Sequence, residues 1–198
     1  MNCYVMVGGH SRRMGQSKVG LPFAGTTLLG HIVGIAWQAF QRVVAVQRPE
    51  GEPLRGVETI FELPHDSEAP IFGVLRALQH ARARCFILAV GYPLITAEVL
   101  RFLRTRSEQS TSAMVVPVWS GLAQVLCAGY SFDLEPRIEQ QISGGRLSLR
   151  SIAAGAEIIA EDDLRSRFPG EPLMNVNTPD DLQEAKRLYD QQGLLTSR

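Results

Sequence analysis

The chain has 198 residues, of which 45% are hydrophobic and 20% are charged, so it is long enough for one buried core and too short for two comfortable domains. Lys and Arg together number 20, and so do Asp and Glu. The resulting formal charge of zero disfavours nucleic acid or an anionic membrane as a partner, so any anion-binding site must be local.

The apolar segments and the cysteines narrow the class of protein further. No apolar run reaches the roughly 18 residues that a membrane span requires, and a strand that starts at Asn2 leaves no room for a signal peptide. Cys3, Cys85 and Cys127 lie far apart in apolar segments, which favours buried free thiols over disulfides or a zinc site. We therefore expect a cytoplasmic protein.

Hydrophobic periodicity predicts strands and helices that alternate along most of the chain. Strands are expected at residues 3–7, 43–46, 57–61, 85–90, 113–117, 124–130, 156–160 and 173–176. Helices are expected at residues 27–40 with Thr26 as the N-cap, at 71–81, at 97–105, after Ser131, up to Ile152 behind a turn at Gly144 and Gly145, and at 179–189.

This alternation predicts an α/β fold, namely a single-domain, Rossmann-like three-layer sandwich with a mostly parallel central sheet. One domain would cover residues 1–190, and residues 191–198 would form a polar C-terminal tail. In such sheets ligands bind at the carboxyl ends of the strands. The loops expected to hold the site are therefore those after Val7, Phe61, Val90 and Val176.

The first of these loops combines glycines with cations. Gly8 and Gly9 let the backbone approach a ligand, while Arg13 and Lys18 add fixed positive charge. The arrangement suits a phosphate group, although neither the P-loop spacing nor the G-x-G-x-x-G fingerprint is present. On the residues alone, an ordinary strand-to-helix loop with a solvated basic edge is the alternative.

The same segment resembles the signature L-A-G-G-x-S-x-R-M-G-x-D-K of the nucleotidyltransferases that include molybdenum cofactor guanylyltransferase. The positions in register are Gly8, Gly9, Ser11, Arg13, Met14, Gly15 and Lys18. Val7 replaces the family Ala, and Ser17 replaces the Asp that precedes the lysine. The resemblance implies guanine rather than cytosine, because the cytidylyl type carries L-A-A-G where this chain has Gly8-Gly9.

A second match lies near the C-terminus, where residues 175–182 are similar to the family element N-x-N-T-P-x-D-L. Asparagine amides at a strand end can contact phosphate, metal or pterin, so Asn175 and Asn177 are candidate site residues. The remaining matched residues fit helix initiation and are interpreted as mainly structural; they are Thr178, Pro179 and Asp181.

The loop after the third expected strand carries a looser match. Asp66 precedes Pro70-Ile71-Phe72-Gly73, which is similar to the family's G-P-L-A-G. A carboxylate there could accept hydrogen bonds from guanine or from ribose hydroxyls. Alternatively, Asp66 or Ser67 caps the helix that follows.

Two weaker matches occur in the middle of the chain. Residues 121–126 resemble the family's G-x-x-Q-P-L, with Val125 in place of the Pro. Gly144-Gly145-Arg146 resembles a glycine and basic residue that precede a late helix. Arg146 is a candidate contact for the anionic pterin, or else a solvated surface arginine.

The main departure from the family pattern is at Gly91. The family strand ends in C-D-x-P-[FLY] and its Asp holds magnesium; alignment through Pro93 places Gly91 at that position. Glycine offers no side-chain oxygen to a cation that prefers hard oxygen ligands. Mg²⁺ is still the cofactor that the resemblance implies, and Asn175 and Asn177 are the residual ligand candidates.

The resemblance implies transfer of GMP from GTP to the terminal phosphate of molybdopterin or Mo-molybdopterin, with release of pyrophosphate. Arg13 and Lys18, the candidate catalytic residues, would bind phosphates, and Gln47 would replace a family asparagine near the base. The nucleotide would be cradled through the backbone of Met6, Val7, Gly8 and Gly9. Molybdenum cofactor assembly proteins or an apo-molybdoenzyme are the further partners implied.

Two other functions are open at this point. One is nucleotidyl transfer from CTP, or onto a sugar-phosphate acceptor. The other is a non-catalytic relative that only binds a nucleotide or cofactor. Gly91 favours the latter, because the loss of a metal ligand should slow transfer by orders of magnitude.

Overall fold

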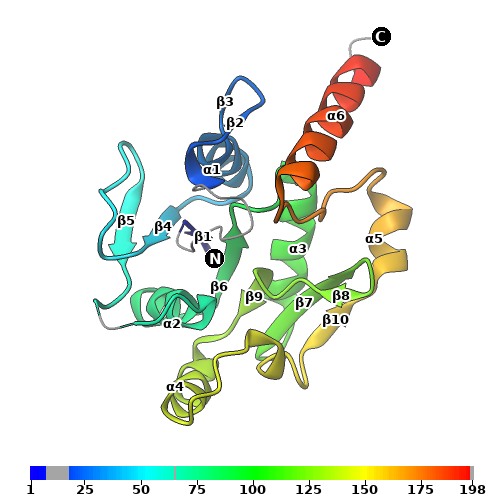
Figure 1. Cartoon of the computed structure of the whole chain (residues 1–198). Coiled ribbons are helices and arrows are strands. Elements are labelled where there is room, and N and C mark those ends of the chain that lie inside the picture. The colour runs from blue at the N-terminus through cyan, green and yellow to red at the C-terminus, as the bar shows by residue number, and fades with distance from the viewer. Residues whose placement is uncertain (8–17, 65, 197–198) are drawn as a thin grey trace.

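The computed structural model describes residues 1–7, 18–64 and 66–196, with side chains up to residue 191. Its main element is an eight-stranded sheet with the strand order β10-β7-β9-β6-β1-β4-β5, to which β8 adds by pairing with β7 (Figure 1). The strands of this sheet are β1 (Asn2–Met6), β4 (Val43–Gln47), β5 (Glu58–Phe61), β6 (Cys85–Ala89), β7 (Met114–Trp119), β8 (Leu122–Ala123), β9 (Cys127–Tyr130) and β10 (Glu157–Ile159). A separate short hairpin joins β2 (Pro22–Phe23) to β3 (Thr26–Thr27).

Parallel pairing dominates the half of the sheet around β1. This strand pairs in parallel with β4 on one side and with β6 on the other, and β5 adds in parallel to β4. β9 runs antiparallel to both β6 and β7, so the sheet is mixed. The expected α/β class with a mostly parallel sheet is confirmed. The carboxyl ends of β1, β4, β5 and β6 therefore meet at one edge, which is where such sheets bind ligands.

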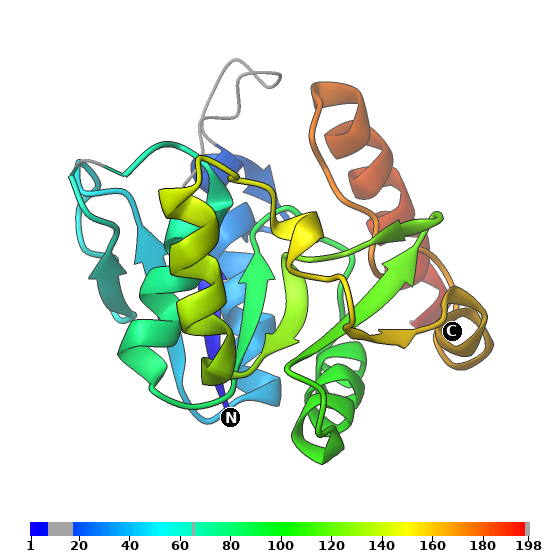
Figure 2. The same ribbon diagram turned by 90° about the horizontal axis from the view of Figure 1, so that it is seen from below.

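Helices cover both faces of the sheet and make three layers (Figures 1 and 2). α1 (Leu28–Ala39) and α3 (Ala97–Gln109) lie on one face, and α2 (Pro70–Ala81) and α4 (Glu135–Ser143) lie on the other. Side chains of β1 alternate between the two cores: Cys3 and Val5 share one with α1 and α3, and Tyr4 and Met6 share the other with α2. α5 (Glu161–Arg167) and α6 (Pro179–Thr196) contribute to the first core.

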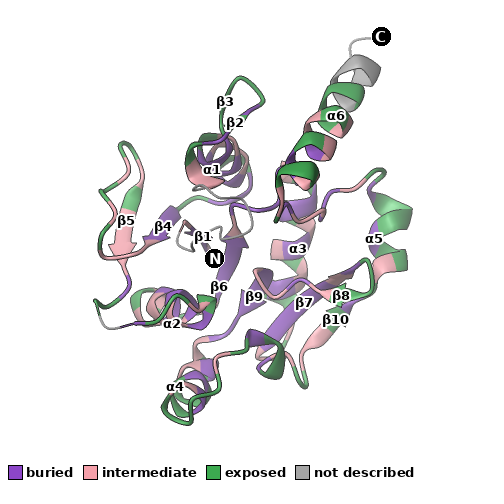
Figure 3. Cartoon of the chain, viewed as in Figure 1, coloured by how far each residue is buried: buried purple, intermediate pink, exposed green. Residues whose placement is uncertain are grey.

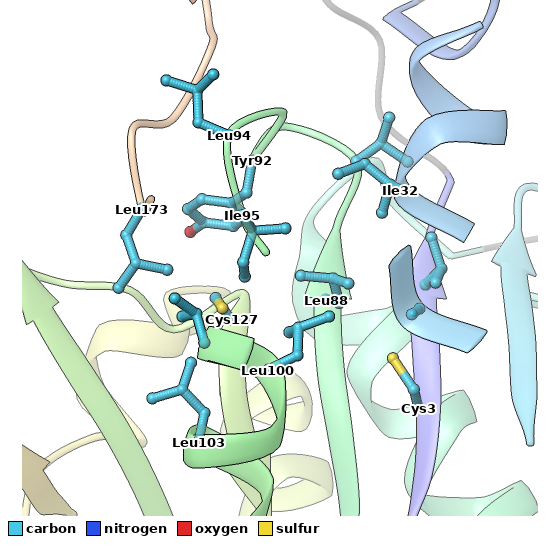
Figure 4. Close-up of a cluster of buried hydrophobic side chains, with 14 of the residues drawn as sticks. Cys3, Ile32, Leu88, Tyr92, Leu94, Ile95, Leu100, Leu103, Cys127 and Leu173 are labelled. Carbon is cyan, nitrogen blue, oxygen red and sulfur yellow. The ribbon is translucent and has the colours of Figure 1, made fainter. Parts of the chain in front are cut away.

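The central strands are buried along most of their length, whereas α5 is largely exposed (Figure 3). Figure 4 shows side chains of α3, among them Leu100 and Leu103, packed against the sheet near Leu88. The three cysteines are buried and free, as predicted. None of the helices in the described part of the chain is long and apolar enough to cross a membrane.

Two expected elements differ in the structure. Residues 173–176 lie in irregular backbone instead of a strand, and Val176 N donates to Gly91 O at 2.8 Å. The apolar pattern of this segment reflects its packing, since Leu173 and Val176 are buried in the first core. α6 continues to Thr196 and does not end at Tyr189.

Short elements and helix starts also depart from the expectation. Thr27, not Thr26, caps α1, because its Oγ1 accepts from Gly30 N at 3.1 Å. The expected helix up to Ile152 is a 3-10 turn (Leu149–Ser151). The hairpin β2–β3, β8 and α5 are absent from the sequence-based prediction, because elements of two to seven residues give little periodic signal.

Candidate functional site

The loop that follows β1 is described in part. Gly8, Gly9 and Arg13 lie outside the described residues, so their expected roles stay predictions. Met6, at the end of β1, is buried, and Val7 N donates to Val46 O at 2.9 Å, which ties the start of the loop to β4. Beyond the loop, a short 3-10 helix (Lys18–Gly20) begins with the lysine of the motif.

Lys18 joins the two sequence motifs in space. Its ammonium group donates to Val176 O at 2.5 Å and to Asn177 Oδ1 at 3.0 Å. These acceptors follow Lys18 by 158 and 159 positions in the sequence, and both belong to the asparagine segment 175–177. The structure therefore brings the lysine of the first loop and the C-terminal motif to one place.

The residues after the asparagine segment form a helix cap. Thr178 Oγ1 accepts from Asp181 N at 3.1 Å, while Asp181 Oδ2 accepts the N–H groups of Asn177 and Thr178, both at 2.8 Å. Although partial burial opposes the effect, these hydrogen bonds and the nearby Lys18 lower the pKa of Asp181 below its ordinary value. Thr178 and Asp181 thus start α6 by a reciprocal cap, which agrees with their structural interpretation.

Gly91 lies directly against the asparagine segment. A Cβ atom added at this residue would sit 2.7 Å from Asn175 Oδ1 and 3.5 Å from Val176 O. The Asn175 amide oxygen therefore occupies the space beside the backbone where a larger residue 91 would begin its side chain. Any such residue requires the Asn175 side chain to move.

The residues at this edge do not fit a resident magnesium site. No group of three or more His, Cys, Asp or Glu side chains that could hold a metal occurs within the described residues. Gly91 supplies no side-chain oxygen, the Asp181 carboxylate is engaged by two N–H groups, and Asn177 Oδ1 accepts from Lys18. Magnesium prefers several hard oxygen ligands in octahedral geometry. Here the Lys18 ammonium group binds two oxygens of the asparagine segment instead, Val176 O and Asn177 Oδ1.

A cavity of about 410 Å³ opens beside Asn175 and Asn177. Tyr92, Trp119 and Gln124 form part of its wall. Tyr92 Oη donates to Gln124 Oε1 at 3.0 Å, and Gln124 Nε2 donates to the backbone oxygen of Trp119 at 3.0 Å. Burial raises the pKa of Tyr92 well above its ordinary value, so its hydroxyl stays protonated as a donor. Tyr92 and Trp119 are each only 1% exposed, so they support this wall from behind and hold the amide of Gln124 in place. Gln124 is the Gln of the weak G-x-x-Q match.

The arginine that lines this cavity is not the one expected. Arg146 is exposed and is not part of the lining, whereas Arg150, in the 3-10 turn after it, lines the cavity. The sequence pattern pointed to the first basic residue after the glycine turn. The pattern does not predict that the 3-10 turn after Arg146 brings Arg150 to the cavity.

Gln47 is the last residue of β4, and its side chain contacts the loop that follows this strand. Its Nε2 donates to Glu52 O at 2.9 Å. Its Oε1 is buried and has no hydrogen-bond partner among the residues that the structure describes. A buried amide oxygen without a partner is costly unless a ligand donates to it. A role for Gln47 near the base of a nucleotide stays a prediction.

Asp66 stabilises its own turn. Its Oδ2 accepts from Leu63 N at 2.7 Å. The capping alternative is wrong, because the N-cap of α2 is Ala69 and has no side-chain cap hydrogen bond. Asp66 is buried, and its backbone oxygen accepts from Arg48 Nη2 at 3.0 Å.

A carboxylate absent from the sequence-based candidates, Glu62, directly follows β5. It is only 6% exposed, and its Oε2 accepts from Arg48 Nη1 at 2.8 Å. Its Oε1 lies 2.7 Å from the position that a Cβ on Gly73 would take. Burial raises the pKa of Glu62 above its ordinary value, although Arg48 opposes the shift. The sequence did offer one indication of its role, because Glu62 directly follows a strand whose carboxyl end lies at the edge where such sheets bind ligands.

The carboxyl edge of the sheet therefore combines the Lys18 ammonium group, an amide oxygen with no partner among the described residues, a buried carboxylate and an asparagine segment. Strand ends with convergent polar groups of this kind are typical of α/β proteins that bind a nucleotide there. Residues 3–162 match the MobA-like NTP transferase domain. The chain therefore belongs to the MobA-like NTP transferase family and is a nucleotidyltransferase.

Curated relatives are similar over most of their length. A molybdenum cofactor guanylyltransferase from Mycobacterium tuberculosis is 34% identical over 181 residues, which are 88% of this chain and 87% of the relative. The one from Mycobacterium avium is 35% identical over 188 residues, which are 90% and 91% of the two chains.

Solved structures confirm the fold. Molybdopterin-guanine dinucleotide biosynthesis protein A from Archaeoglobus fulgidus has a TM-score of 0.82 at 26% identity, and the match covers 96% of this chain and 100% of that one. A Mycobacterium tuberculosis protein crystallised with manganese shares the fold at 16% identity and a TM-score of 0.61, over 94% of this chain and 97% of that one. NTP transferases of this family generally depend on a divalent cation.

Proposed function

We propose that the chain transfers GMP from GTP to the terminal phosphate of molybdopterin or Mo-molybdopterin and releases pyrophosphate. The observation that carries this proposal is the position of Lys18, whose ammonium group joins the nucleotide loop to the asparagine segment. The relatives named molybdenum cofactor guanylyltransferase support the choice of substrates. A cation at this junction suits nucleotidyl transfer, because the phosphates of donor and acceptor have to meet there.

Phosphate binding on the nucleotide side is assigned to the first loop. Arg13 and Lys18 would bind the phosphates of GTP as fixed cations. Backbone N–H groups of Gly8 and Gly9 would complete the cradle. Met6 and Val7 would border it, since the N–H of Val7 already donates to Val46 O at 2.9 Å.

Base recognition is assigned to the ends of β4 and β5. Gln47 Oε1 is a buried acceptor, and Glu62 is a buried carboxylate beside Gly73. Guanine presents two neighbouring N–H donors on its pairing edge, which match two such acceptors, whereas adenine and cytosine present one donor beside an acceptor. Asp66 would support this site by holding Arg48, which in turn holds Glu62.

The acceptor is assigned to the cavity beside Asn175 and Asn177. The side-chain amides of these two asparagines can hydrogen-bond the polar ring edge of a pterin. Arg150 lines this cavity and would bind the terminal phosphate, while Arg146 is a weaker candidate because it lies outside the lining.

Transfer then needs no covalent enzyme intermediate. An oxygen of the acceptor phosphate attacks the α-phosphorus of GTP, the bond to the oxygen that bridges to the β-phosphate breaks, and pyrophosphate leaves. Lys18 and Arg13 would stabilise the negative charge on these groups. GTP would enter as its Mg²⁺ complex, so that the cation belongs to the substrate.

A non-catalytic nucleotide-binding role is the second candidate, and Gly91 favours it because no carboxylate stands at the end of β6. Calorimetric titration of GTP, CTP and ATP, followed by a pyrophosphate-release assay with molybdopterin, separates the possibilities. We expect GTP to bind most tightly and to turn over. Lys18→Ala should weaken GTP binding, whereas Lys186→Ala, at the other lysine of the chain, should not.

Other results of these two assays would favour a different function. GTP binding without pyrophosphate release would favour the non-catalytic role. Preference for CTP or for a sugar phosphate would favour a different nucleotidyl transfer. If no nucleotide binds, the proposed function is wrong.

A further inference from the structure

At the end of β6, the uncharged amide oxygen of Asn175 occupies the space beside Gly91. Asn175 Oδ1 lies 2.7 Å from the position of a Cβ on Gly91, and the backbone is fixed beside it because Val176 N donates to Gly91 O at 2.8 Å. Asn175 can take this position only because residue 91 has no side chain. The glycine and the asparagine therefore act as one packed unit.

The oxygens next to this unit already have a cation. Val176 O and Asn177 Oδ1 accept from the Lys18 ammonium group. The carboxylate of Asp181 is turned to the N–H groups of Asn177 and Thr178, where it caps α6. A divalent cation brought to the same oxygens would meet a positive charge on Lys18 and no carboxylate from residue 91, both of which disfavour its binding.

We propose that Lys18 takes the place of a resident divalent cation in this protein, and that the free protein binds no such cation at the end of β6. A divalent cation would then enter only as part of a metal–nucleotide complex. The inference rests on the proposed function for the identity of the nucleotide. It extends that function by naming which cation the protein itself provides.

The direct test is titration of nucleotide-free protein with Mn²⁺, followed by the electron paramagnetic resonance signal of free Mn²⁺. The wild-type protein should leave the signal unchanged. Gly91→Asp should bind one Mn²⁺ at least about tenfold more tightly than wild type, because it adds a carboxylate at this edge. Gly91→Asn and Gly91→Ala are matched controls: both displace Asn175 as Asp does, and neither should gain affinity.

The role of Lys18 has its own measurement. In the Gly91→Asp background, Lys18→Met should tighten Mn²⁺ binding further, since the competing charge is removed. With GTP supplied as its Mg²⁺ complex, Lys18→Met should bind the nucleotide about tenfold more weakly than wild type, because a charged hydrogen bond is lost.

The outcomes are separable. One Mn²⁺ bound by the wild-type protein, or no gain in folded Gly91→Asp, overturns the inference. Should Gly91→Asp lose its cooperative thermal transition, Gly91→Asp/Asn175→Ala removes the contact and is titrated in its place. GTP binding only with Mg²⁺ agrees with the inference and with the proposed function, because the cation then arrives with the nucleotide. No GTP binding under either condition overturns both.

Discussion

Replacing Arg48 with Met removes one half of the buried Arg48–Glu62 ion pair, which lies at the proposed base site. The Arg48 side chain is 20% exposed and that of Glu62 is 5% exposed. Arg48 also donates to Ser67 O at 2.9 Å and to Asp66 O at 3.0 Å. Removing one partner of a fully buried pair costs about 3–5 kcal/mol. Because water reaches a fifth of Arg48, we expect Arg48→Met to lower the free energy of unfolding by about 2 kcal/mol.

The loss should depend on pH. Burial raises the pKa of Glu62, and Arg48 is the group that opposes the rise, so Arg48→Met raises this pKa further. A group with a raised pKa in the folded state contributes stability below its unfolded pKa and loses it as the pH rises through the folded pKa. The variant should therefore lose less stability at about pH 5, where a larger fraction of Glu62 is neutral, than at about pH 8.

Urea denaturation followed by circular dichroism measures both effects. Arg48→Met/Glu62→Gln should recover most of the loss at the higher pH, because it no longer buries an unpaired charge. Arg42→Met is the matched control: its pair with Glu58 is close, at 2.6 Å, but the two side chains are 49% and 38% exposed, so stability should barely change. An equal loss at both pH values, or no recovery in the double variant, would refute the reasoning.

Asp181→Ala should lower the free energy of unfolding by about 1–2 kcal/mol in the same assay, because the reciprocal cap of α6 is lost; an unchanged midpoint would contradict the cap. Arg150→Ala should raise the KM for the acceptor without changing GTP affinity, whereas Arg146→Ala should change neither the KM nor the GTP affinity. If only Arg146→Ala raises the KM, Arg146 and not Arg150 contacts the acceptor. Gly73→Ala should weaken GTP binding in calorimetry, because the new Cβ would clash with Met6 Cε, would lie 2.7 Å from Glu62 Oε1 and would displace both side chains; unchanged affinity would remove Glu62 from the proposed base site.

The fold was predictable where the pattern is local. The apolar runs that form β1, β4 and β6 and the helical spacing in α1 and α2 led to the correct α/β class and a mostly parallel sheet. Segment 173–176 failed because burial alone made it look like a strand. Leu173 and Val176 pack into the core from irregular backbone, and no sequence pattern separates these two cases.

The candidate site was predictable as two motifs, and Lys18 does meet the asparagine segment. The sequence did not predict which carboxylate at this edge of the sheet would be buried. Glu62 is buried because Gly73 leaves room for it and Arg48 pairs with it, and both conditions arise from other elements. Similarly, Arg150 lines the cavity because a 3-10 turn redirects the chain after Arg146.

The contact between Lys18 and the asparagine segment has a consequence for synthesis of the protein. Val176 and Asn177 follow Lys18 by 158 and 159 positions, so the ribosome must release nearly the whole chain before the ammonium group meets these two oxygens. By then β1, β4 and β6 have long been available to pair. A nascent chain can therefore build its sheet before the proposed phosphate site forms, and translation that stops before residue 175 yields a sheet that lacks the asparagine segment.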